Sequence, residues 1–136
     1  MTPEEKFGHW KSYAEQDLDA AEAMFETGRW FYVLFCCQQA IEKLVKGLYV
    51  IYVDENVPRI HNIKAIVERI EDKLTVEIPE THYRLFKILT GYYTDSRYPD
   101  YINKVGKGVD KVKSSEILKN TREAFVWLLT LRPSED

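Results

Sequence analysis

The sequence predicts an all-α protein, an up-down four-helix bundle with an additional short helix, formed by a single domain over residues 1–136. Apolar residues recur at spacings of three and four along most of the chain, which is the period of a helix with one buried face. Glycine and proline divide the chain into segments of helical length. No stretch of any length alternates apolar and polar residues as a half-buried strand would. With 136 residues, 45% of them hydrophobic, the chain is long enough to bury a sizeable core.

The first helix is predicted from its start, its apolar face and its end. Thr2 can cap the helix, Pro3 suits the first helical position, and Glu5 completes a Thr-x-x-Glu capping box. Gly28 is expected to end the helix, because a left-handed residue at the C-terminal end costs glycine least. The residues of its apolar face are Phe7, Trp10, Ala14, Leu18, Ala21 and Phe25.

A second helix is predicted to follow within two residues of this glycine. Its apolar seam consists of Leu34, Cys37, Ile41, Leu44, Leu48 and Ile51. Gly47 lies inside the helix, where glycine costs about 1 kcal/mol relative to alanine, so we expect a close contact with a neighbouring helix there. Cys36 and Cys37 are adjacent within an apolar run, which predicts two reduced, buried thiols in a cytosolic protein.

Three further helices complete the predicted bundle. A short third helix follows "NVPR", with an inner face of Ile63, Ile66, Val67, Ile70 and Leu74. Pro79 opens the fourth helix, which should stop near Ser96 because Pro99 disfavours helical backbone at Tyr98. The inner face of this helix is Leu85, Phe86, Leu89 and Tyr93. Residues 98–113 are predicted to form a loop. The fifth helix should then run from about Ser114 to Leu131, with Ile117, Leu118, Thr121, Phe125 and Leu128 inward.

Composition and motifs exclude several classes of function. The net charge of −3 lacks the basic footprint of a duplex-binding protein. No apolar run approaches the roughly 20 residues that span a bilayer, and "MTPEEKFGHW" does not resemble a signal peptide, so a cytoplasmic protein is expected. The three histidines fall in different segments without metal-ligand spacing, so we expect no metal and no cofactor.

The segment "YYTDSRYPDY", residues 92–101, is the strongest candidate site. Arg97 offers a planar fork for a phosphate or carboxylate, and the rings of Tyr93 and Tyr98 could stack on a base. Asp95 lies beside them in the sequence. The alternative interpretation is structural: Tyr93 belongs to the core, Tyr98 packs over the turn, and Arg97 pairs with Asp95 or Asp100.

The second helix carries the other candidate residues. Gln39, Lys43 and Lys46 share one face at i, i+4 and i+7, and Gln38 and Glu42 share another. These polar residues beside an apolar seam could contact a phosphate or another chain. From spacing alone the favoured alternative is a solvated face, on which the Glu42–Lys46 pair contributes a few tenths of a kcal/mol.

Together these segments resemble the HEPN family, named for nucleotide binding in higher eukaryotes and prokaryotes. The resemblance rests on "YAEQDLDAAEAMFETGRWFYVLFCCQQAIEKLVKGLY", "HNIKAIVERI" and "YYTDSRYPD", and it extends over roughly residues 10–131. It implies a helical bundle that forms a homodimer, with the arginine of the fourth helix in a cleft at the dimer seam. It also implies a possible partner, a minimal nucleotidyltransferase, with which many family members form a toxin–antitoxin or regulatory pair.

A large subset of the family consists of metal-independent ribonucleases with an Arg-x4–6-His motif, and this chain departs from that motif. Counted from Arg97, the permitted histidine positions hold Ile102, Asn103 and Lys104. We therefore expect a non-catalytic nucleotide- or RNA-binding module, with Lys43 or Lys46 near Arg97. The alternative is an endoribonuclease that uses Arg97 with a non-standard histidine such as His61. A third possibility is an interaction protein without a ligand.

Overall fold

The computed structural model describes residues 1–95 and 108–132, with residues 94 and 95 as backbone only. This part of the chain forms five helices and no strand, which confirms the predicted all-α class. The helices are α1 (Pro3–Glu26), α2 (Trp30–Tyr52), α3 (Ile63–Glu71), α4 (Glu80–Asp95) and α6 (Lys111–Leu129). None of them is long and apolar enough to cross a membrane.

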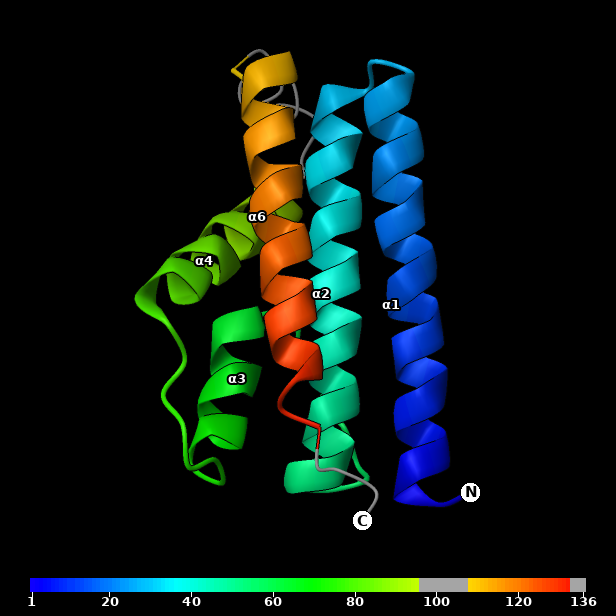
Figure 1. Ribbon diagram of the computed structural model, residues 1–136, viewed down its shortest axis with the longest axis vertical. Helices are drawn as coiled ribbons and strands as arrows, with labels where there is room; N and C mark the ends of the chain where they lie inside the picture. Colours follow the sequence, from blue (N-terminus) through cyan, green and yellow to red (C-terminus); the bar gives the residue numbers. More distant parts are fainter. Residues whose placement is uncertain (96–107, 133–136) are drawn as a thin grey trace.

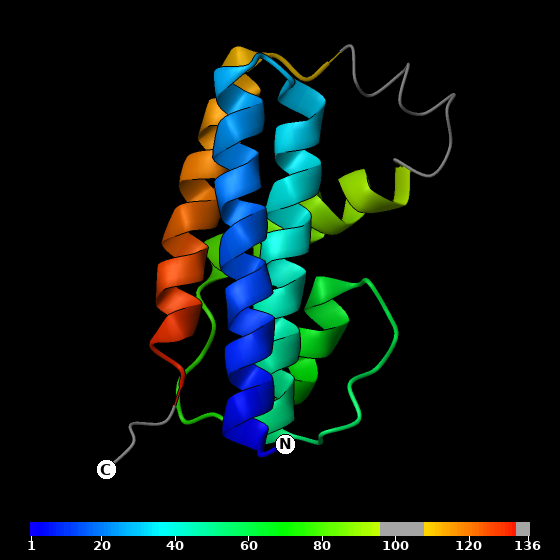
Figure 2. The ribbon, with the colours of Figure 1, turned by 90° about the vertical axis from the view of Figure 1, so that its right-hand side faces the viewer.

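Helix α2 lies at the centre of the bundle and contacts each of the other four helices. Helices α1, α2 and α6 run side by side along the long axis, with α1 antiparallel to α2 (Figure 1). The shorter helices α3 and α4 cover the opposite side of α2 from α1, and α4 crosses it obliquely (Figures 1 and 2). Because α2 is surrounded in this way, most of its side chains are buried, including polar ones.

The start and end of α1 follow their predicted signals. The Thr2 hydroxyl accepts a hydrogen bond from the backbone N–H of Glu5 at 3.1 Å, as in a capping box. Beyond the other end, Gly28 has a φ of 76°, a conformation that favours glycine.

The fold also explains the glycine at position 47, inside α2. A Cβ added there would lie 3.0 Å from the Cβ of Trp10 and 3.1 Å from the ring of Phe7, so glycine allows α1 to pack close against α2.

Three details differ from the sequence-based expectations. Helix α6 begins at Lys111 rather than near Ser114, because the Asp110 carboxylate caps it by accepting from the Lys113 N–H at 2.8 Å. Helix α3 ends at Glu71, so Leu74 packs against the core from the turn that follows. Of the two free cysteines, Cys37 is buried but Cys36 is only half-buried. The predicted end of α4 near Ser96, and most of the predicted loop, lie outside the described residues.

Candidate functional site

A polar stripe on α2 is buried inside the bundle. Gln38, Glu42 and Lys46 are spaced one turn apart and are 0%, 4% and 7% exposed. The favoured prediction of a solvated face is therefore wrong for these three residues. The physical reason is the central position of α2, which packs against α3 and α4, while His61, just before α3, contacts Gln38 and Glu42.

Glu42 is the centre of a hydrogen-bonded network. Its carboxylate accepts from the Gln38 side-chain amide at 2.8 Å and from the Lys46 ammonium at 3.1 Å. The Nδ1 atom of His61 lies 3.1 and 3.2 Å from the two Glu42 oxygens. Burying a carboxylate is unfavourable unless it is paired and hydrogen-bonded, and these three partners satisfy that requirement.

The position of His61 is fixed by the start of α3. Asn62 caps this helix by accepting the Ala65 N–H at 3.2 Å, so His61 lies immediately before the first turn. A carboxylate can only accept hydrogen bonds, so the His61 Nδ1 atom that faces Glu42 carries a hydrogen. The second ring nitrogen, Nε2, is then the acceptor of a neutral ring and a donor of a charged one.

Tyr93 connects this network to the end of α4. Its ring centroid lies 4.7 Å from that of His61 and 5.9 Å from that of Phe35, with which it stacks at an interplanar angle of 16°. Tyr93 is half-buried, and it belongs to the segment from which the predicted site was drawn. Asp95 lies in the last turn of α4, and its side chain is not described. Arg97 and Tyr98 lie outside the described residues, so their role stays a prediction.

The two lysines of α2 do not share one polar face as predicted. The Lys43 ammonium pairs with Asp17 of α1 at 2.6 Å, whereas Lys46 turns toward Glu42. Gln39, the third member of the predicted face, donates to the side-chain oxygen of Gln38 at 2.6 Å. The face is divided because α1 offers a carboxylate on one side of α2 and the buried network lies on the other. Whether either lysine lies near Arg97 stays a prediction.

A pocket of about 450 Å³ lies beside the network, between α1, α2 and the segment that precedes α3. The residues that line it are Trp10, Lys46, Val57, Pro58, Arg59 and His61. Arg59 is exposed and makes no ion pair or hydrogen bond with the described residues. The pocket thus combines the Lys46 ammonium, which is paired with Glu42, the guanidinium of Arg59, an imidazole and an indole. Such a set can bind an anion through charge and hydrogen bonds.

Two residues of this pocket, Trp10 and Arg59, are not predicted as site residues from the sequence. The helical period predicts Trp10 on the apolar face of the first helix, and the structure shows it half-buried at the edge of that face. No local pattern singles out Arg59, because its place at the pocket depends on how the segment after α2 folds back.

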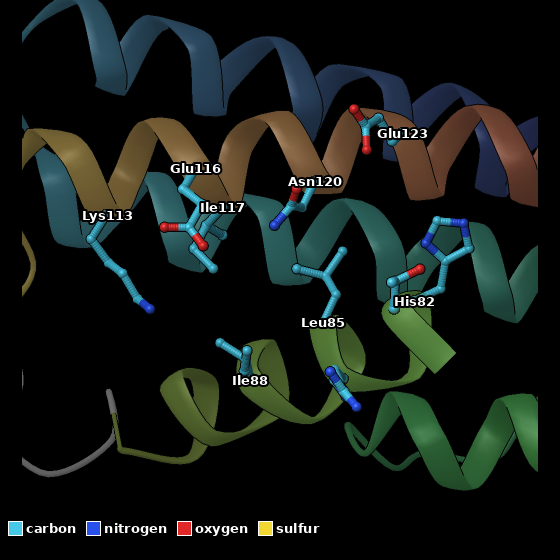
Figure 3. A pocket seen from close by; sticks show the side chains of 10 residues that line it. His82, Leu85, Ile88, Lys113, Glu116, Ile117, Asn120 and Glu123 are labelled. Atoms are coloured by element: carbon cyan, nitrogen blue, oxygen red, sulfur yellow. The ribbon is translucent and has the colours of Figure 1, made fainter. Parts of the chain in front are cut away.

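A second pocket, of about 380 Å³, lies between α4 and α6 (Figure 3). Lys113, Glu116, Asn120 and Glu123 of α6 line one side, with His82 and Ile88 among the residues of α4 on the other. Burial lowers the pKa of His82, although the nearby Glu123 carboxylate acts in the opposite direction. Charges of both signs line this pocket, so it lacks the anion preference of the first.

Within the described residues, no cluster of three or more histidine, cysteine or acidic side chains could hold a metal ion.

The chain belongs to the HEPN domain family, whose model matches residues 7–131. The fold is similar to the crystal structure of TT1696 from Thermus thermophilus, with a TM-score of 0.79 and 22% identity over 93% of this chain and 98% of that one. It is also similar to ST0689, an archaeal HEPN homologue, with a TM-score of 0.68 and 23% identity over 92% of this chain and 96% of that one. No curated protein matches the chain. At these identities the solved structures show the fold alone.

Proposed function

We propose that this HEPN protein is a non-catalytic module that binds a nucleotide or the end of an RNA through its phosphate. The observation that carries the proposal is the convergence of Lys46, Arg59 and His61 on one pocket of a chain whose net charge is −3. Cations gathered at a concave site concentrate anions locally, whatever the net charge of the protein. Lys46 and Arg59 would contact the phosphate oxygens, and His61 would donate to them through Nε2 when it is protonated.

Arg97 and Tyr98 are the proposed extension of this site. They follow α4 within five residues of Tyr93, whose ring packs on His61 at the edge of the network. As the family resemblance implies an anion-binding role for Arg97, an arginine there would contact a further phosphate of ATP or RNA. The ring of the neighbouring Tyr98 could stack on a second base of an RNA. Of the two candidate lysines, Lys46 is the one that lines the pocket, and Lys43 is paired with Asp17.

A ribonuclease is the second candidate function, and the Glu42–His61 pair favours it. A carboxylate that holds one nitrogen of a histidine ring orients the other nitrogen for proton transfer, which is the arrangement of many general bases. The chain lacks the histidine of the family motif, so His61 would have to act with Arg97 at the same scissile phosphate. We prefer the binding function, because it requires only the groups that line the pocket.

The proposal includes two kinds of partner. A second copy of the chain would pair through α4 and the residues after it. Gln38, Glu42 and Lys46 cannot contribute to that seam, because they are buried within one chain. A minimal nucleotidyltransferase, in a toxin–antitoxin or regulatory pair, would be the second partner. Light scattering at micromolar concentration tests the homodimer, and co-purification of the two proteins from one expression strain tests the heteromer.

Titration with AMP, ATP and a short single-stranded RNA, together with an RNA digestion assay, tests the function. Arg59→Gln should weaken the binding of all three ligands at least several-fold, Arg97→Ala should do the same for ATP and RNA, and Arg69→Gln should weaken none of them. Arg69 is a suitable control because it is an exposed arginine on α3 that does not line the pocket. Cleavage of RNA by the wild type, abolished in both His61→Ala and Arg97→Ala, would replace the binding function with the ribonuclease. Absence of both binding and cleavage would reject both functions.

A further inference from the structure

An aromatic surface on α1 adjoins the proposed phosphate pocket. His9, Trp10 and Tyr13 line a separate hollow of about 230 Å³. Trp10 also lines the pocket that contains Lys46, Arg59 and His61. The two hollows therefore share one residue, Trp10, with cations lining one and aromatic rings lining the other.

The aromatic rings of this surface are not part of the hydrophobic core. Tyr13 is 56% exposed, and His9, one turn before it on the same face of α1, is also exposed. Neither ring takes part in an aromatic pair or a hydrogen bond within the described residues. Large rings gathered at a hollow without a packing partner are typical of a surface that receives a ligand.

Trp10 is held in place by the close packing of α1 on α2. Gly47 permits this approach, because a Cβ added to this residue would lie too close to the Cβ of Trp10. Lys46 directly precedes this glycine in the chain, and its side chain lines the same pocket as Trp10. The position of the aromatic surface relative to Lys46 is thus set by helix packing, whereas Arg59 comes from the segment between α2 and α3.

We propose that His9, Trp10 and Tyr13 form a stacking platform for a single unpaired base, whose own phosphate lies in the pocket lined by Lys46 and Arg59. This inference rests on the proposed function and assigns the base to α1, away from the end of α4. The ligand is one nucleoside monophosphate unit, because a pocket of about 450 Å³ and a hollow of about 230 Å³ offer room for one phosphate and one base. A free mononucleotide and the 5′-phosphorylated end of an RNA strand share this chemistry.

The test compares ligands that keep or lack the base. AMP, ribose 5-phosphate and a 5′-phosphorylated oligoadenylate are titrated into wild type, Tyr13→Ala and Tyr32→Ala. Tyr32 is a matched control, because it is also 56% exposed but lies on α2 and outside the hollow. Tyr13→Ala should bind AMP about 5- to 150-fold more weakly than the wild type, because it lacks one base–aromatic stack. The affinity for ribose 5-phosphate should stay unchanged, and Tyr32→Ala should bind all three ligands like wild type. Both tyrosines are exposed, so both variants are expected to fold.

The outcomes separate this inference from the proposed function. If AMP binds but Tyr13→Ala leaves its affinity unchanged, the platform is rejected while nucleotide binding stands. Equal affinity of the wild type for AMP and ribose 5-phosphate would reject it as well. If none of the ligands binds, the proposed function fails and the platform fails with it. With the platform supported, tighter binding of AMP than of the oligoadenylate identifies a free mononucleotide as the ligand, and the reverse order identifies an RNA end.

Discussion

Substitution of Glu42 by glutamine tests the buried network directly. The change keeps the shape of the side chain but removes the charge that pairs with Lys46, and it places an amide opposite the Gln38 amide and His61. The side chains of Lys46 and Glu42 are 8% and 6% exposed, so the lysine would remain largely buried without its counter-ion. Breaking a buried ion pair in this way typically costs about 3–5 kcal/mol.

We expect the lower end of this range, about 3 kcal/mol, because Lys46 borders the pocket and water can reach its ammonium from there. The exposed pair of Lys64 and Glu68 provides a matched control, since it has the same i, i+4 spacing at 3.6 Å. Its side chains are 39% and 56% exposed, and Glu68→Gln should cost only about 0.3–0.5 kcal/mol. The two substitutions make the same chemical change, one in a buried ion pair and one in an exposed pair, and Glu42 has Gln38 and His61 as further partners.

Urea unfolding followed by circular dichroism measures both free energies. A double variant, Glu42→Gln with Lys46→Met, should recover part of the lost stability, because it removes the uncompensated charge as well. A loss for Glu42→Gln no larger than that for Glu68→Gln would refute the buried network. The same would follow if Lys46→Met made the Glu42→Gln variant less stable still.

Three further predictions concern packing and titration. Gly47→Ala should destabilise the protein by about 1 kcal/mol, because the new methyl group would meet the Cβ of Trp10, which is fixed to α1. Gly91→Ala has open space around the new methyl group and should stabilise α4 by up to about 1 kcal/mol. Thermal unfolding of the two variants compares these effects. The pKa of His82 is lowered in the folded state, so the unfolded chain binds a proton more readily and the protein loses stability as the pH falls through about 6.5. Urea unfolding should therefore show a smaller loss of stability between pH 7 and pH 5 for His82→Gln than for the wild type. Burial raises the pKa of Cys37 to about 12, so its thiol should resist iodoacetamide at pH 8 until the protein is unfolded, as mass spectrometry would show.

Much of the fold could be predicted because its determinants are local in the sequence. The cap at Thr2, the left-handed Gly28 and the small Gly47 each mark a feature that the structure contains. The sequence predicts the start of α6 near Ser114, three residues late, because the mixed charges around Asp110 mask its capping role. A cap depends on a single side chain, so composition over a window is a weak guide to it.

The site was harder to predict, because its residues come together only in the folded chain. The sequence shows Lys46 and Glu42 as an i, i+4 pair, but their burial depends on the packing of α3, α4 and His61 against α2. One signal was present: Lys46 is the only charged residue in "LVKGLYVIY", and a charge isolated among apolar residues of a central helix has few routes to solvent. Arg59 has no comparable signal.

The charges around the pocket explain why an anion would be preferred even with His61 neutral. Glu42 and Lys46 cancel each other, so the exposed Arg59 leaves the site with an excess of positive charge, and protonation of His61 would add another. Because Arg59 is exposed, its attraction for a phosphate is screened by salt over about 8–10 Å. Binding should therefore weaken as salt rises, but far less steeply than the roughly six to ten phosphate contacts of a typical duplex-binding protein would imply. This shallow dependence is the electrostatic signature of a site that holds one phosphate, and it distinguishes such a site from a surface that follows a nucleic-acid backbone.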